Sequence, residues 1–473
     1  MSVTPFTRIT RPVRVGLLTP YFAFFDARFP PDYRSSQEAY AARLADALRA
    51  AGLEVTPSGL VDGAESAALA RERFREARVE IVVAAATMAA PPIYGALALE
   101  GFDGPIVIWD DKRARRFESN LDEVEATRAS GILGSIMLAN VLGREGRRYL
   151  VATTVDGDAT EVVRAVRGAA AAGALRGARL GLLGGIIAGY GDVILDEVTA
   201  AKLGIELISI SEDAIARATV RSKDAARTGL PASMVLTETA VPLVDRSLRI
   251  HRFLAALAST ERLDALALNC HSDILRFGDA FGVVGCLASS LLWSAGLPVA
   301  CTGDAATAVA LMLAARIAGS AQYCEGYAVE SETGELVVSS CGMADVSLRK
   351  PSEPAHLCPN ELYPGRHGLG VATRFAFDAG PATIAAFGPA TKTLPARLVI
   401  SVGRLTGRGF EHLNGPSGTI TFDRPGAGGA SAAWIEAGPA HHLALMRGDR
   451  RTELRSASTF LGIDLIEVDH AAP

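Results

Sequence analysis

Short, continuous apolar runs alternate with segments of helical periodicity along most of this chain, and that alternation limits the folds open to it. Residues 13–19, 80–84 and 105–109 are such runs, each of a length suited to a strand buried on both faces. Between the first two, Leu44 and Leu48 repeat at the four-residue spacing of a helix. Strands that alternate with helices form parallel β–α–β units. The sequence therefore predicts an α/β protein with open parallel sheets.

Capping signals give the expected boundaries of two helices. Ser35 and Glu38 have the spacing of a capping box, and Gly52 ends the helix that they would begin. Asp192 is expected to cap a second helix over residues 193–203. Each helix is expected to connect two neighbouring parallel strands.

The alternation restarts after Gly177, and beyond Pro351 it gives way to short β-like runs separated by glycine-rich turns. We therefore predict two successive Rossmann-like open parallel-sheet domains, over residues 1–172 and 173–350. A smaller β-rich C-terminal domain is predicted over residues 351–473. Its expected strands include residues 396–402, 419–422 and 432–436.

The composition excludes several classes of function. Lys and Arg total 47 against 52 Asp and Glu, and the nearest approach to a cationic patch, residues 112–116, is too small for a nucleic-acid surface. The longest apolar stretches are interrupted by small residues and stop short of a membrane span. The six cysteines include no Cys-x-x-Cys pair, so we expect free thiols in a cytoplasmic protein.

Polar residues follow three strands of the predicted central domain. They are residues 269–273 (Asn-Cys-His-Ser-Asp), 301–304 (Cys-Thr-Gly-Asp) and 324–325 (Cys-Glu). Ligands of parallel sheets bind beyond the carboxyl ends of the strands, so we expect these clusters to line one cleft. Asp273 and Asp304 have a second interpretation, as caps of the helices that follow them.

A glycine-rich turn at residues 184–191 also joins a strand to a helix, where backbone amides can hold an anion. Its glycines lack the Gly-x-Gly-x-x-Gly spacing, and no acidic residue ends the next strand at the ribose position. We therefore predict no nucleotide cofactor.

Ordered motifs in the second half of the chain resemble the family of L-fucose and L-arabinose isomerases. Leu-Pro-Val-Ala-Cys-Thr-Gly-Asp (297–304) precedes a small-residue helix, and Cys-Glu (324–325) begins a hairpin that ends at Ser-Cys-Gly (340–342). The pair His-His (441–442) precedes a short apolar run, a helix and a last strand. The resemblance covers most of the chain in this order. It implies a sugar isomerase that assembles as a homo-oligomer.

The resemblance also implies a metal-assisted reaction. In that family a Mn²⁺ ion, held by two carboxylates and a histidine, binds two oxygens of the sugar while a proton moves between C1 and C2 through an enediol. A metal polarises the carbonyl, and a positioned carboxylate removes the adjacent proton. By this resemblance Glu325 and His442, or its neighbour His441, are metal ligands. Glu325 is one implied catalytic carboxylate. Asp304 is the candidate for the second if the alignment is shifted, since in the direct alignment it matches the aspartate of the family's own Gly-Asp.

Two of the family's positions are changed in this chain. Thr302 stands where the family has a glutamate, and Ser340 stands where it has a histidine. Neutral hydroxyls coordinate Mn²⁺ poorly, so the resemblance implies a diverged metal site. The residues predicted to contact a carbohydrate or related polyol are Asn269, Cys270, Asp273, Thr302, Ser340 and Trp109. Trp109 belongs to this set unless residues 109–112 are simply an exposed loop.

Three functions remain open on these grounds. The first is a sugar isomerase with Mn²⁺. The second is a lyase or epimerase on the same scaffold that works without Mn²⁺, with His271 and Glu325 as acid and base, or with Cys270 activated beside His271. The third is a sugar-binding protein without catalysis.

Overall fold

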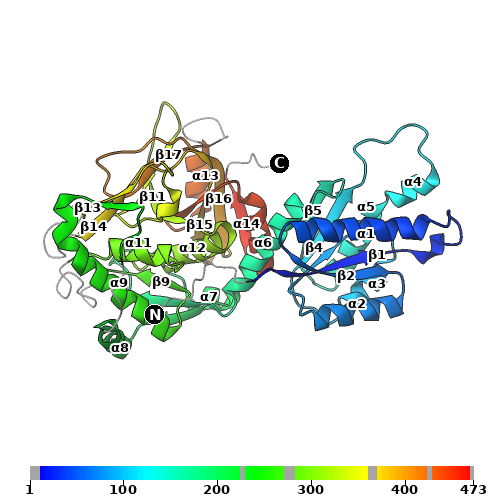
Figure 1. The fold of residues 1–473 in the computed structure, drawn as a ribbon, viewed down its shortest axis with the longest axis horizontal. Coiled ribbons are helices and arrows are strands. Elements are labelled where there is room, and N and C mark those ends of the chain that lie inside the picture. Colours follow the sequence, from blue (N-terminus) through cyan, green and yellow to red (C-terminus); the bar gives the residue numbers. More distant parts are fainter. Residues whose placement is uncertain (1–10, 224–228, 271–282, 361–369, 423–428, 469–473) are drawn as a thin grey trace. The chain divides into compact units, whose positions relative to one another are not determined.

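The computed structural model describes residues 11–223, 229–270, 283–360, 370–422 and 429–468 (Figure 1). The chain forms two compact units. The N-terminal unit comprises Thr10–Gly173 together with Thr452–Gly462. The central unit comprises Ala174–Arg451 and the segment that begins at Ile463.

The N-terminal unit contains a five-stranded parallel sheet with the order β2-β1-β3-β4-β5, which is a doubly wound arrangement. Its strands are β1 (Arg14–Pro20), β2 (Glu54–Val61), β3 (Ile81–Ala84), β4 (Ile106–Lys112) and β5 (Tyr149–Val155). Its helices are η1 (Ala23–Phe25), α1 (Tyr33–Ala50), α2 (Ala64–Glu76), α3 (Pro92–Ala98), α4 (Glu123–Arg128), α5 (Gly131–Arg144), α6 (Thr160–Leu175) and α14 (Arg451–Leu461). Apolar residues of α2, α3 and α5 pack on one face of this sheet.

The central unit begins with a second parallel sheet, of order β10-β9-β6-β7. Its strands are β6 (Arg179–Leu183), β7 (Glu206–Ser209), β9 (Ala265–Leu268) and β10 (Val299–Ala300). The helices of this part are α7 (Glu197–Leu203), α8 (Glu212–Lys223), η2 (Glu238–Ala240), α9 (Val241–Glu261), α11 (Cys286–Ser294), α12 (Ala305–Ala318) and η3 (Val346–Leu348). Helix α12 is buried along nearly its whole length. Its alanine-rich sequence allows neighbouring elements to approach it closely.

A six-stranded antiparallel barrel completes the central unit. Its strands pair in the order β15-β18-β11-β12-β17-β16, and β15 also pairs with β16 to close the circle. They are β11 (Gln322–Val329), β12 (Leu336–Ser339), β15 (Gly380–Gly388), β16 (Arg397–Leu405), β17 (Ser417–Phe422) and β18 (His442–Arg447). Strand β19 (Asp464–Glu467) joins β16, and helix α13 (Gly429–Ala437) follows β17. A small sheet of β8 (Met234–Leu236), β13 (Ala355–Asn360) and β14 (Gly370–Arg374) lies beside the barrel strands in the same hydrophobic core.

These sheets confirm the predicted fold class, an α/β protein with two parallel sheets and a β-rich C-terminal region. Strands β11 and β12 precede Pro351 but belong to the barrel, because β11 pairs with β12 and β12 pairs with β17. The change in composition at Pro351 therefore does not mark the start of the barrel. Helix α14 follows the barrel in sequence but belongs to the N-terminal unit. No helix in the described part of the chain is both long and apolar enough to cross a membrane.

Three local predictions were wrong. Helix α1 begins at Tyr33, so Ser35 lies inside it and donates to the carbonyl of Asp32 over 2.9 Å. Helix α7 begins at Glu197 and is capped by Asp196, whose carboxylate accepts from the amide of Thr199 over 2.8 Å. Residues 432–436 lie within helix α13, where the high helix propensity of alanine decides the conformation.

Trp109 has a structural role that the sequence did not indicate. Strand β4 continues to Lys112, so residues 109–112 are part of the sheet. The indole is 1% exposed, and its N–H donates to Thr154 Oγ1 over 2.6 Å. A buried, hydrogen-bonded indole fills a core position. The structure therefore assigns Trp109 to the core of the N-terminal unit and not to a substrate-binding loop.

The turn that follows β10 is held in an unusual conformation. Thr302 and Gly303 both have positive φ, of 58° and 75°. A Cβ atom at Gly303 would overlap the carbonyl oxygen of Gly185, in the turn that follows β6. Only glycine satisfies both the left-handed backbone and this close approach. The close contact between the two turns fixes where the next residue, Asp304, begins α12.

We expect Gly303→Ala to lower the free energy of unfolding by about 3 kcal/mol or more, because it adds a steric clash to backbone strain. Gly319→Ala is the matched control, since Gly319 ends α12 with a φ of 73° and has no atom within 4 Å of its would-be Cβ. That control should lose only about 1 kcal/mol. Urea unfolding of both variants measures the difference, and equal losses would contradict the role of the Gly185 contact.

Candidate functional site

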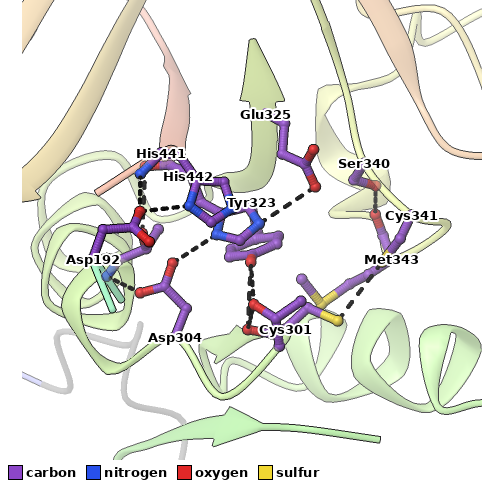
Figure 2. Close-up of polar contacts among 12 residues, drawn as sticks. Asp192, Cys301, Asp304, Tyr323, Glu325, Ser340, Cys341, Met343, His441 and His442 are labelled. Atoms are coloured by element: carbon purple, nitrogen blue, oxygen red, sulfur yellow. Dashed lines mark hydrogen bonds and ion pairs between the residues drawn. The ribbon is translucent and has the colours of Figure 1, made fainter. Parts of the chain in front are cut away.

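His442 lies at the centre of a buried polar cluster in the central unit (Figure 2). It is the first residue of β18 and the direct cross-strand partner of Glu325 on β11. Cross-strand partners project to the same face of a sheet, so this register brings the two side chains together. The distance from His442 Nε2 to Glu325 Oε1 is 3.3 Å. His442 is 1% exposed and Glu325 is 35% exposed, so the cluster is accessible through the carboxylate.

Asp304 binds the other side of the same imidazole. Its Oδ2 atom lies 2.8 Å from His442 Nδ1, and its Oδ1 atom accepts from the amide of Thr307 over 2.7 Å. Asp304 therefore caps α12, as one interpretation of the sequence predicted, and contacts His442 at the same time. Its predicted catalytic role stays a prediction. The hydroxyl of Thr307 adds a third link, by donating to the carbonyl of His442 over 3.3 Å.

Burial by itself would lower the pKa of His442, but the hydrogen bonds to Asp304 and then Glu325 outweigh it and raise that pKa to about 9. His442 is therefore an imidazolium near neutral pH. In that state both ring nitrogens donate, Nδ1–H to Asp304 and Nε2–H to Glu325. Buried ion pairs of this kind require every partner, because the loss of one leaves an uncompensated charge.

A second carboxylate–histidine pair lies beside the first. His441 Nδ1 is 2.6 Å from Asp192 Oδ2, and the backbone amide of His441 donates to the same oxygen over 3.0 Å. Burial opposes ionisation of Asp192, but the hydrogen bonds from His441 hold the pKa of Asp192 below its usual value. The rings of His441 and His442 are 3.8 Å apart, so both histidines take part, each with its own acid. Asp192 makes this contact instead of capping a helix.

Tyr323 forms the floor of the cluster. It precedes Glu325 by two residues on β11, so both side chains lie on the same face, and its ring centroid is 4.6 Å from that of His442. The hydroxyl is 3.2 Å from Thr302 Oγ1 and 3.3 Å from the carbonyl of Cys301. Burial raises the pKa of Tyr323 well above its usual value, so the phenol is neutral. Tyr323 was not predicted as a site residue, although its two-residue spacing from Glu325 on one strand places both side chains on the same face.

Thr302 and Ser340 have their hydroxyls engaged elsewhere. Thr302 Oγ1 donates to the carbonyl of Cys301 over 2.7 Å. Ser340 Oγ donates to the carbonyl of Met343 over 2.7 Å, within the turn that follows β12. Figure 2 shows Ser340 pointing toward Met343 and away from His442. Thr302 thus supports Tyr323, and Ser340 supports its own turn.

Asn269 and Cys270, which follow β9, are buried, at 2% and 3% exposed. Asn269 Nδ2 donates to the carbonyl of Gly184 over 3.3 Å, which ties this strand end to the next one in the sheet. His271 and Asp273 lie outside the described residues. The structure therefore leaves their predicted roles in acid–base chemistry and substrate binding as predictions.

Buried thiols surround the floor of the cluster. The Sγ atoms of Cys301 and Cys341 are 3.7 Å apart, and Cys270 contacts Cys301. All six cysteines are free. Contacts with Cys270 and Cys341, followed by burial, raise the pKa of Cys301 well above its usual value. Thiols held in this protonated state are poor nucleophiles.

Two positions of the manganese site that the resemblance implies offer no free ligand, because the hydroxyls of Thr302 and Ser340 are committed to carbonyl groups. Glu325 and His442, at two other positions, lie 3.3 Å apart. What the cluster offers is one charged acid, His442, beside one accessible base, Glu325.

No protein-family model matches the sequence, and a search of curated proteins found no relative. The chemistry of the site must therefore be argued from its geometry.

The pKa of His442 predicts how stability depends on pH. A histidine with a pKa of about 9 when folded, and near 6.5 when unfolded, contributes stability that is complete below pH 6.5. That contribution, on the order of 3 kcal/mol, is lost as the pH rises through 9. Urea unfolding at about pH 6 and about pH 9.5 should show the loss. Asp304→Asn should reduce it by roughly half or more, since asparagine still caps α12 but carries no charge.

Asp192→Asn is the matched control, because it removes the acid of the exposed neighbouring pair and leaves Asp304 in place. We expect that variant to retain the loss of stability above pH 6.5. An unchanged pH dependence in Asp304→Asn would contradict the assignment of the raised pKa to this pair.

Proposed function

We propose that this protein interconverts an aldose and a ketose by proton transfer, with Glu325 as the base and His442 as the acid. The observation that carries the proposal is the contact between a partly exposed carboxylate and a buried imidazolium, 3.3 Å apart on neighbouring strands. A general base and a general acid within reach of one substrate are what enolisation of a hydroxycarbonyl compound requires.

The chemistry would proceed through an enediol. Glu325 removes the proton from the carbon next to the carbonyl group, and His442 Nε2–H donates its proton to the carbonyl oxygen. Glu325 then returns its proton to the former carbonyl carbon, and the hydroxyl of the other carbon returns a proton to His442. The product is an isomer of the substrate, and both side chains recover their starting states.

Asp304 acts as a positioning residue in this scheme. It holds Nδ1, so that Nε2 faces Glu325, and its negative charge keeps the imidazole protonated. The 3.3 Å separation of Nε2 and Oε1 is long for a charge-assisted hydrogen bond. A carbonyl oxygen of the substrate can therefore compete with Glu325 for the Nε2 proton.

The resemblance to sugar isomerases supports the choice of substrate class, and the contact between Glu325 and His442 supports the choice of reaction. The acid role falls to His442 because its Nε2 atom lies 3.3 Å from Glu325 Oε1. An epimerase would instead return the proton to the opposite face of the original carbon, which requires a second acid besides Glu325. A product assay separates the two reactions.

The test is incubation of the protein with a panel of aldoses in D₂O, followed by NMR of the products. We expect ketose formation with deuterium at the carbon that exchanges. Treatment with a chelator should leave the rate unchanged, and a rate that depends on added Mn²⁺ would contradict the metal-free scheme. Deuterium in recovered aldose without ketose would indicate enolisation without isomerisation, and appearance of the epimeric aldose would indicate epimerisation. No exchange with or without Mn²⁺ would refute catalysis by this pair.

Glu325→Gln should lower kcat by about 10²- to 10⁴-fold, because it removes the base. Glu330→Gln is the matched control, since Glu330 follows the same strand but pairs with Arg408 at the surface. Its kcat should be unchanged. Circular dichroism of both variants checks the fold, and equal activities would exclude Glu325 as the base.

A further inference from the structure

The mouth of the barrel contains a cavity of about 630 Å³ that plays no part in the proposed reaction. Its wall includes Ile384, Ser401 and Leu443 from three neighbouring strands, with Tyr327 from β11 and Trp434 from α13. Cavities of roughly 300–1,000 Å³ are the usual size for small-molecule sites. This volume is therefore large enough for a whole ligand.

The cavity lies on the opposite face of the strands that hold the catalytic pair. Leu443 follows His442 on β18, and successive residues of a strand project to opposite faces. Leu443 is the cross-strand partner of Cys324, just as His442 is the partner of Glu325. One ladder therefore presents His442 and Glu325 on one side and the cavity on the other.

The lining determines what the cavity can accept. Among the described residues that line it, none is Asp, Glu, Lys or Arg, and the imidazole of His441, which also lines it, is already paired with Asp192. A charged ligand would lose its hydration without gaining a free counter-charge. Aromatic and aliphatic side chains, among them Tyr327, Trp434 and Phe422, instead favour an uncharged apolar molecule.

The hydroxyl of Ser401 is a second, independent observation that favours a bound ligand. It is 1% exposed, lines the cavity, and its hydroxyl has no hydrogen-bond partner among the described residues. A buried hydroxyl without a partner is unfavourable and rare in native proteins. A ligand with one polar group would satisfy it.

The rim of the cavity is apolar and exposed. Tyr327 is 42% exposed, Val329 is 38% and Ile435 is 77%. Large apolar side chains gathered around an opening are typical of a binding site. They provide a path by which an apolar molecule can enter.

We propose that the barrel binds a neutral, largely apolar small molecule that makes one hydrogen bond to Ser401. The cavity is lined by His441 but by neither Glu325 nor His442, and its existence does not depend on the function proposed for those two residues.

Two fluorescent probes with the same aromatic frame test this proposal on the full-length protein. N-phenyl-1-naphthylamine is neutral and has one N–H group, whereas 8-anilino-1-naphthalenesulfonate adds a negative charge. We expect the neutral probe to bind with increased fluorescence, and the sulfonate to bind at least about tenfold more weakly. Equal affinities for the two probes would overturn the proposal.

Ser401→Ala should weaken binding of the neutral probe by about five- to tenfold, the effect of one hydrogen bond. The melting temperature should not fall, because the lost hydroxyl had no partner. Ser339→Ala is the matched control on β12, where the hydroxyl donates to the carbonyl of Pro416 over 3.0 Å. That control should bind the probe normally and melt at a lower temperature.

Ile384→Phe provides a second variant, because a larger side chain would occupy the cavity. It should abolish probe binding while the protein remains folded by circular dichroism. Unchanged binding in both Ser401→Ala and Ile384→Phe would place the probe elsewhere and refute the site. Probe binding that decreases as the protein is concentrated would also refute it, in favour of a second copy of the chain seated on the rim.

Discussion

The contacts of the His442 imidazolium with Asp304 and Glu325 connect three elements of the central unit. The imidazolium links β18 of the barrel to the first turn of α12 through Asp304, and to β11 through Glu325. Helix α12 and strand β11 are neighbours in the sequence, but His442 lies 138 residues beyond Asp304. A neutral imidazole carries a single N–H and could donate to only one of the two acids. The protonated ring is therefore what allows both carboxylates to remain where the fold places them.

The repeating pattern of the sequence predicts the sheets well, because it reflects burial. Strand β3 is buried at every position and α12 at nearly every position, and the apolar run predicted at residues 80–84 lies within a residue of the bounds of β3. Helix ends were predicted less well, since several nearby acids can serve as caps. Asp192 and Asp196 both precede α7, and only the contact with His441, 249 residues later, explains why Asp196 is the cap.

The same distinction applies to the site. Glu325 and Asp304 were candidates because they follow strand ends, and His442 was implied by the resemblance. Their arrangement was not predicted, since it depends on the register between β11 and β18. Tyr323 was missed because a tyrosine inside an apolar strand looks like a core residue, and Trp109 was misassigned because β4 extends further than its apolar run. Composition indicates which residues are polar, whereas register decides which of them meet.

The position of α14 has a consequence for how the chain is made. The N-terminal unit is discontinuous, because its last helix is contributed by residues close to the C-terminus. Ser456 donates to the carbonyl of Ala165 on α6, and the fully buried carboxylate of Glu453 pairs with Arg164. During synthesis, this surface of α6 stays uncovered until α14, which follows β18 in the sequence, has left the ribosome. The N-terminal unit is thus completed only after most of the central unit has been made, and a nascent chain exposes an apolar helix face throughout that interval.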